Sequence, residues 1–175
     1  RLVEDEIRQK KPFRTELQKA LVTLMRTNDE VRRYLSGLVE PAGVTLQQYN
    51  VLRILRGAGN ESLPTLEIAD RMIERTPGVT RLLDRLVDRR LVDREYCSED
   101  RRRVLCSITS NGLDVLTRLD DALHKSDVED LRELTDADMS SLTELLDRLR
   151  AQVRDAAMRH DTSLLQTNNA STRGE

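Results

Sequence analysis

The chain has 175 residues, 38% of them hydrophobic and 34% charged, with few aromatic side chains and a formal net charge of −2. This charge argues against a uniformly basic nucleic-acid-binding surface, and two cysteines are too few for a disulfide framework, so a reducing cytoplasm is the expected compartment. No apolar run approaches the roughly 18 residues of a membrane span, and no P-loop, dinucleotide-binding or nucleophile-elbow motif is present. We therefore expect no membrane partner, no enzyme activity and no cofactor.

The first third of the chain is predicted to form two amphipathic helices. In residues 14–40, apolar side chains recur every three or four positions, which is the spacing of one helix face. Pro41 and Gly43 should end this helix. Thr45 can then cap a second helix over 46–57, because its hydroxyl can accept a hydrogen bond from a free N–H of the first turn.

A short helix and a longer one are expected next. Thr65 can cap the short helix, over 65–73. Thr76 followed by Pro77 predicts the start of the longer helix, since a capping hydroxyl then precedes proline at the first helical position. Its inward face follows the spacing i, i+3, i+4 and i+7 and consists of Val79, Leu82, Leu83 and Leu86.

Beyond Leu91 the apolar period changes from 3.6 to 2, which indicates strands. Residues 92–97 and 103–109 are predicted to form a two-stranded hairpin, with 98–102 at its tip.

The last part of the chain is predicted to be helical. One helix starts at Thr109 or Ser110, and another starts at Thr135, which with Asp138 resembles a capping box. Residues 158–175 have no period, so we expect a disordered tail there.

The central order of helix, short helix, turn, helix and hairpin is the plan of a winged helix-turn-helix. We predict a mainly α (α+β) fold in which residues 45–109 form this DNA-binding module, whose second helix would enter a major groove about 12 Å wide. The apolar stripes of residues 14–40 and 110–157 exceed what one small module can bury. These two segments are therefore expected to form a helical dimerisation region.

The candidate DNA-binding residues lie on the second helix and at the hairpin tip. Small residues at the helix start let the backbone approach DNA closely, and a helix N-terminus favours phosphate. The planar fork of arginine suits phosphate oxygens or a narrow minor groove, and Asp100 would hold a neighbouring guanidinium in one rotamer. These candidates are Thr76, Gly78, Thr80, Arg81 and Arg85 on the helix and Arg101 and Arg102 at the tip, with Arg103 at the start of the next strand as a further cation that could reach phosphate.

Each group of arginines also has a structural explanation that involves no DNA. Arg81 and Arg85 could pair with Asp84 and Asp88 on a solvated helix face. The hairpin arginines could simply prevent edge-to-edge pairing of strands.

Residues 15–155 resemble the MarR family of bacterial transcriptional regulators. The resemblance is densest in "LEIADRM", "TPGVTRLLDRLVDRRLVDREYCSEDRRRVLCSIT" and "SNG". The family has an Asp-Arg-Arg-type wing tip, then an apolar strand ending in Leu/Ile-Thr and a glycine a few residues on. Here these are Asp100-Arg101-Arg102, Val104–Thr109 and Gly112.

This resemblance implies the roles of individual residues and the partners of the chain. It implies that residues 76–81, which include Pro77, lie with Arg85 along the major groove. It implies that Arg102 reaches the minor groove, supported by Asp100 and Arg101. It further implies a homodimer that binds a pseudo-palindromic operator in double-stranded DNA, and many relatives are repressors released by small aromatic or phenolic effectors. The ligand-binding residues stay unassigned.

The turn before the second helix departs from the family pattern. Ile73 and Glu74 occupy places that usually hold a glycine and then an apolar residue, and Arg75 stands where a capping serine is common. The cap is therefore expected to have moved to Thr76.

Two other functions remain open from the sequence. A winged helix can serve as a protein-interaction module without binding DNA. Alternatively, Cys97 near the base of the wing could sense oxidants, with Arg94 or Arg101 lowering its pKa. Cys106 alternates with apolar residues and is expected to be a small core side chain. His124 and His160 are too few and too far apart for a metal site.

Overall fold

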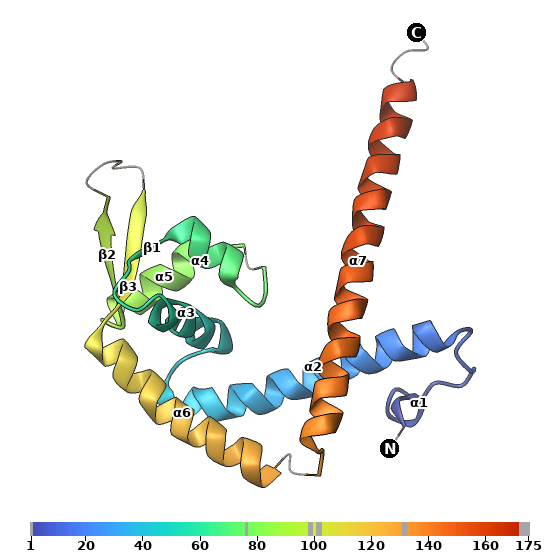
Figure 1. Ribbon diagram of the computed structural model, residues 1–175, viewed down its shortest axis with the longest axis horizontal. Coiled ribbons are helices and arrows are strands. Elements are labelled where there is room, and N and C mark those ends of the chain that lie inside the picture. Colours follow the sequence, from blue (N-terminus) through green and yellow to red (C-terminus); the bar gives the residue numbers. More distant parts are fainter. Residues whose placement is uncertain (1, 76, 98–99, 101–102, 131–132, 172–175) are drawn as a thin grey trace. The chain divides into compact units, whose positions relative to one another are not determined.

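The computed structural model (Figure 1) describes the backbone of all residues except 1, 76, 98–99, 101–102, 131–132 and 172–175. It divides into two compact units, Arg1–Lys125 and Ser126–Glu175. The elements in chain order are α1 (Val3–Glu6), α2 (Glu16–Val39), the 3-10 helix η1 (Glu40–Ala42), α3 (Leu46–Gly57), β1 (Leu63–Pro64), α4 (Thr65–Arg71), α5 (Val79–Asp88), β2 (Val92–Tyr96), β3 (Val104–Ile108), α6 (Ser110–Asp130) and α7 (Asp136–Ser171).

Local caps explain where the helices of the first unit begin and end. The hydroxyl of Thr45 accepts from the backbone N–H of Gln48 at 3.2 Å, and the Gln48 side chain accepts from the Thr45 N–H at 3.0 Å. This capping box satisfies two backbone donors that would otherwise be unpaired, and it confirms the predicted N-cap of α3. The preceding η1 ends at Gly43, whose φ of 73° lies in the left-handed region.

The core of the first unit lies between α3, α4, α5, α6 and the sheet, as Figure 1 shows for the helices gathered beside the strands. The predicted inward face of α5 is confirmed, because Val79, Leu82, Leu83 and Leu86 are all buried. Cys106 is fully buried as well, in agreement with its expected role as a small core side chain. The remaining core residues are Val39, Val44, Val51, Leu52, Leu55, Leu63, Ile68, Met72, Leu91, Val92, Val115, Leu116 and Leu119.

The sheet has three antiparallel strands in the order β1-β3-β2, so one strand joins the predicted pair. Strands β2 and β3 pair from Val92 opposite Ile108 to Tyr96 opposite Val104, and they extend beyond the helices as the wing (Figure 1). The additional strand β1 pairs Leu63 with Cys106. It is two residues long and includes a proline, so it has no apolar period by which the sequence could reveal it.

The second unit contains α7, and the predicted capping box of Thr135 and Asp138 lies at its N-terminus. The Thr135 hydroxyl accepts from the Asp138 N–H at 3.2 Å, and Asp138 accepts from the Thr135 N–H at 2.9 Å. Hydrogen bonds from the Thr135 side chain and backbone lower the pKa of Asp138. The helix continues to Ser171 and so extends into the predicted tail, 158–175, because no proline or glycine interrupts it before Gly174.

Two further features of the described residues bear on function. No helix among them is both long and apolar enough to cross a membrane. Within the same residues, no three His, Cys, Asp or Glu side chains are grouped so that they could hold a metal ion.

Candidate nucleic-acid interface

The turn between α4 and α5 is held without the glycine that the family pattern would place there. Met72 leaves α4 in an extended conformation, with φ −62° and ψ 138°. The side-chain oxygen of Asn50, on α3, then accepts from the backbone N–H of Ile73 at 2.9 Å. Because Ile73 has no positive φ, a residue with a Cβ fits without strain.

The same turn is also tied to α2. Glu74, the second departure from the family pattern, forms an ion pair with Arg32 of α2. Two neighbouring residues of the turn therefore contact two helices. The backbone of Ile73 contacts α3, and the side chain of Glu74 contacts α2. These contacts set the direction in which the chain enters α5.

The start of α5 lies later than the sequence predicts. The helix begins at Val79, and its N-cap is Gly78, whose φ of 107° excludes it from a right-handed helix. The predicted start at Thr76 and Pro77 is therefore wrong for Pro77, which lies in the turn, while Thr76 falls outside the described residues. Among the described residues no side chain caps the N-terminus of α5, and a Cβ on Gly78 would meet only open space. The first N–H groups of α5 thus have no capping partner among the residues that the structure describes.

The outward face of α5 presents Thr80, Arg81 and Arg85, all of them exposed. Within the part of the chain that the structure describes, neither arginine forms an ion pair or a hydrogen bond. Asp84 does not pair with them, because it accepts from Nη1 of Arg94 at 2.5 Å. The two arginines remain available to an external anion.

Arg94 was not a candidate DNA-binding residue in the sequence, yet it connects the wing to α5. Burial opposes the charge on this guanidinium, but its hydrogen bond to the Asp84 carboxylate prevails and raises the pKa of Arg94 above its ordinary value. Two of its nitrogens, Nε and Nη2, are buried without a partner among the described residues. The only sequence signal for this position is that Arg94 alternates with the buried Val92 on β2, which directs it inward.

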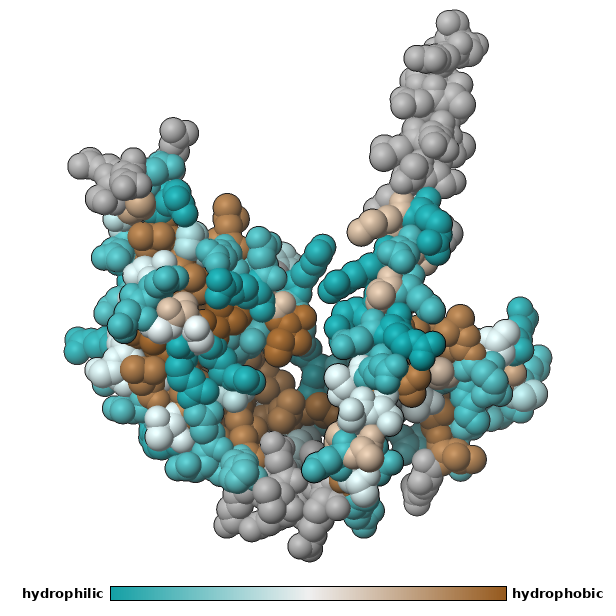
Figure 2. Space-filling model, in the orientation of Figure 1, coloured by the Kyte–Doolittle hydropathy of each residue, from teal (hydrophilic) through white to brown (hydrophobic). Residues whose placement is uncertain are grey.

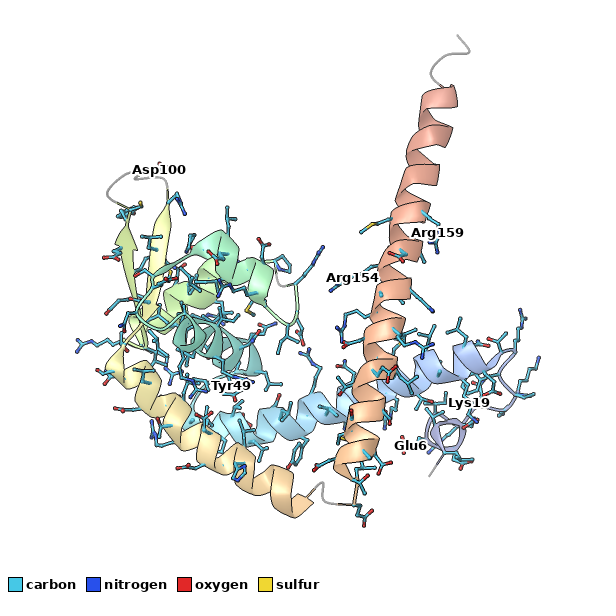
Figure 3. All side chains as sticks on the ribbon, in the orientation of Figure 1. Glu6, Lys19, Tyr49, Asp100, Arg154 and Arg159 are labelled. Carbon is cyan, nitrogen blue, oxygen red and sulfur yellow. The ribbon has the colours of Figure 1, made fainter. Side chains whose placement is uncertain are left out.

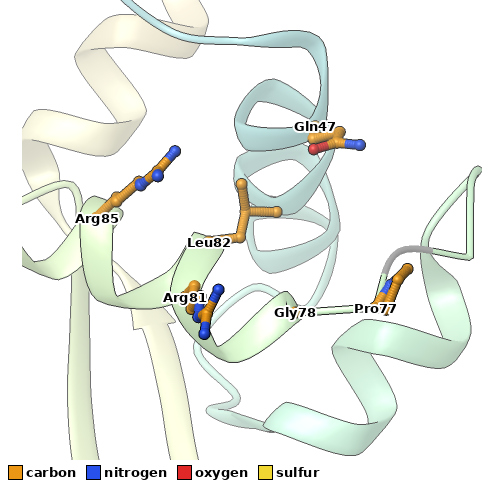
Figure 4. A pocket seen from close by; sticks show the side chains of 6 residues that line it. All are labelled: Gln47, Pro77, Gly78, Arg81, Leu82 and Arg85. Carbon is orange, nitrogen blue, oxygen red and sulfur yellow. The ribbon is translucent and has the colours of Figure 1, made fainter.

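A hollow of about 480 Å³ lies against the start of α5 (Figure 4). Figure 4 shows the two arginines on successive turns of α5 and Gln47 facing the hollow from the first turn of α3. The sequence analysis did not predict Gln47 as a residue of this site. Its position in the first turn of α3 is the only feature of the sequence that could have indicated it. The hollow is lined by Gln47, Pro77, Gly78, Arg81, Leu82 and Arg85.

The wing closes just before its tip. The N–H of Arg103 donates to the carbonyl of Asp100 at 2.8 Å, and the N–H of Cys97 donates to the carbonyl of Arg103 at 2.9 Å. Figure 3 labels Asp100 at the end of this hairpin, far along the strands from the core. The candidates Arg101 and Arg102 lie outside the described residues, so their positions stay predictions.

These features define a winged helix-turn-helix whose α5 exposes Arg81 and Arg85 and whose wing is joined to α5 by the Arg94–Asp84 ion pair. The family model for the MarR family matches residues 42–103. A crystal structure of a MarR transcription factor from Planctomyces limnophilus is 34% identical, with a TM-score of 0.60, covering 78% of this chain and 98% of that one. The chain therefore belongs to the MarR family of DNA-binding transcriptional regulators.

Two further proteins are similar to this chain. The HTH-type transcriptional repressor MdtR of Bacillus subtilis is 39% identical over 74 residues, which are 42% of this chain and 46% of MdtR. A cysteine-to-serine mutant of MarR from E. coli, solved in complex with operator DNA, is 25% identical with a TM-score of 0.65. That comparison covers 77% of this chain and 99% of the E. coli chain.

Proposed function

We propose that the protein is a homodimeric transcriptional repressor that places α5 in the major groove of its operator. The observation that carries this proposal is the exposed pair Arg81 and Arg85, which have no ion-pair partner among the described residues. A major groove about 12 Å wide admits one helix, and arginine can donate two hydrogen bonds to guanine. The E. coli relative that was solved in complex with operator DNA supports an operator as the binding partner.

The uncapped start of α5 suits the approach of a DNA strand. Its free N–H groups carry the positive end of the helix dipole and attract a phosphate. Gly78 has no side chain to obstruct that approach, and the small Thr80 follows in the first turn. We assign Thr76 and Pro77, which precede this helix end, to the same contact.

The wing supplies the second contact. In the proposed complex, Arg102 enters the minor groove, where the negative potential favours a guanidinium, and Asp100 and Arg101 support it. This assignment rests on the family resemblance of the Asp100-Arg101-Arg102 tip and on the hairpin that ends at Asp100.

A second copy of the chain is the proposed occupant of the apolar face of α7. The stripe alternates spacings of three and four residues, the pattern of helices that pack along their length. Much of it is exposed, with Leu142 at 47% and Val153 at 53%, and Figure 2 shows apolar residues among the charged ones on this helix. We therefore assign 14–40 and 110–157 to dimerisation and 45–109 to DNA binding. The α7 stripe consists of Met139, Leu142, Leu146, Leu149, Val153 and Ala156.

The proposal includes repression of transcription and its release by a small molecule. MdtR is named a transcriptional repressor, and it shares 39% identity with this chain over the matched segment. A small aromatic or phenolic effector, bound between the dimerisation and DNA-binding regions, would release the operator. The protein would act in the cytoplasm, where bacterial DNA is found.

Binding to random duplex DNA over a range of salt concentrations tests the central proposal. Phosphate contacts release counterions, so the affinity should fall steeply as salt rises. Arg85→Ala should weaken binding and reduce the slope by about one unit per protomer, about two for the proposed dimer, if this arginine contacts a phosphate. No detectable duplex binding at low salt would instead favour the protein-interaction module.

A further inference from the structure

The two faces of strand β2 have opposite character. Successive side chains of a strand point to opposite faces, so Val92, Arg94 and Tyr96 share one face, and Asp93 and Glu95 share the other. The first face is directed toward α5, because Arg94 reaches Asp84 there and Val92 is in the core. The second face is exposed and acidic.

Tyr96 continues the α5-directed face toward the wing tip. It lies two residues beyond Arg94, about 7 Å further along the strand. It is 74% exposed, although Val104, its partner on β3, packs against the core. Among the described residues no hydrogen bond involves its hydroxyl. Tyr96 thus presents an available donor between α5 and the wing tip.

Electrostatics select the face from which DNA can approach. The carboxylates of Asp93 and Glu95 repel phosphates on the outer face, where Glu95 also accepts from the hydroxyl of Ser62 at 3.3 Å. The face toward α5 adjoins the outward arginines of that helix instead. A duplex with α5 in its major groove and the wing tip in its minor groove must carry one phosphate strand past this face.

We propose that Tyr96 contacts DNA, donating its hydroxyl hydrogen to a backbone phosphate between the two grooves. Tyrosine is among the side chains that contact phosphates, and such contacts fix the position of a protein on the duplex without selecting a sequence. This inference rests on the proposed docking of α5 and the wing.

The test compares Tyr96→Phe with the wild-type full-length protein on a labelled random-sequence duplex at several salt concentrations. Each protomer of the proposed dimer loses one hydrogen bond, so binding should weaken about fivefold per protomer, roughly 25-fold for the dimer, at every salt concentration. The slope against salt should not change, because tyrosine is neutral and releases no counterion. Tyr49→Phe, which removes a hydroxyl from α3, is the matched control and should bind as the wild type does.

A parallel measurement on Arg85→Ala separates this inference from the proposed function. If Arg85→Ala loses affinity and Tyr96→Phe does not, the tyrosine contact is overturned and the docking of α5 stands. If neither variant loses affinity, both the contact and the docking are overturned. A change of salt slope in Tyr96→Phe would also contradict a neutral hydrogen bond to phosphate.

Discussion

The guanidinium of Arg94 on β2 donates to the carboxylate of Asp84 on α5 at 2.5 Å, so one ion pair joins the wing to the recognition helix. The pair is only partly buried, with 26% of the Arg94 side chain and 49% of the Asp84 side chain exposed. Ion pairs exposed to this extent typically contribute only about 0–1 kcal/mol to stability. The geometric effect of this pair is larger, because the two elements that we propose to contact DNA must hold one relative position to reach adjacent grooves.

Asp84→Asn should reduce the free energy of unfolding by about 1 kcal/mol, because it leaves a partly buried guanidinium without its counter-charge. DNA affinity should fall as well, since the wing loses its fixed position. Urea unfolding and duplex binding measure the two effects. Asp88→Asn on the same helix is the control, because Asp88 is exposed and has no ion pair among the described residues. If both variants unfold at the same urea concentration and bind DNA equally well, the ion pair neither stabilises the fold nor positions the wing.

Gly112→Ala should destabilise the protein by about 2–3 kcal/mol through overpacking. A Cβ at Gly112 would lie 2.4 Å from the carbonyl oxygen of Leu91 and 2.7 Å from Cγ1 of Ile108. The oxygen belongs to the backbone, which cannot move aside as a flexible side chain can. Thermal unfolding measures the loss. Gly37→Ala within α2 is the opposite case, since nothing lies within 4 Å of that position, and it should stabilise by about 0.5–1 kcal/mol.

The sequence predicts features that depend on nearby residues and misses those that depend on distant ones. The Thr45 cap and the buried face of α5 follow from spacing within a few residues, and both are confirmed. The start of α5 is wrong because the left-handed Gly78 follows Pro77, and local propensity alone favours proline as the first helical residue. The link that Arg94 makes between the wing and α5 is not predicted, because its partner Asp84 lies on another element and the sequence pattern does not show that the two side chains meet.

The contact between Asn50 and Ile73 should be detectable by amide hydrogen exchange. Asn50→Ala removes the acceptor for the Ile73 N–H, so this amide should exchange faster and the free energy of unfolding should fall by about 1 kcal/mol. Asn50→Asp keeps an oxygen acceptor and should retain most of the protection. If the Ile73 amide is equally protected in Asn50→Ala, another group holds the turn that leads into α5.

Leu149→Glu should convert the proposed dimer to a monomer. Leu149 is central in the α7 stripe, and a carboxylate there would have to be buried against the apolar stripe of the second copy. Gln152→Glu adds the same charge on an exposed part of α7 outside the stripe and should leave the dimer intact. Sedimentation velocity measures the mass, and circular dichroism confirms that the variants stay helical. In the proposed complex one dimer binds two half-sites together, so a helical monomer should also lose affinity for a pseudo-palindromic duplex far more than for a single half-site. A dimeric Leu149→Glu variant would place the interface elsewhere on the chain.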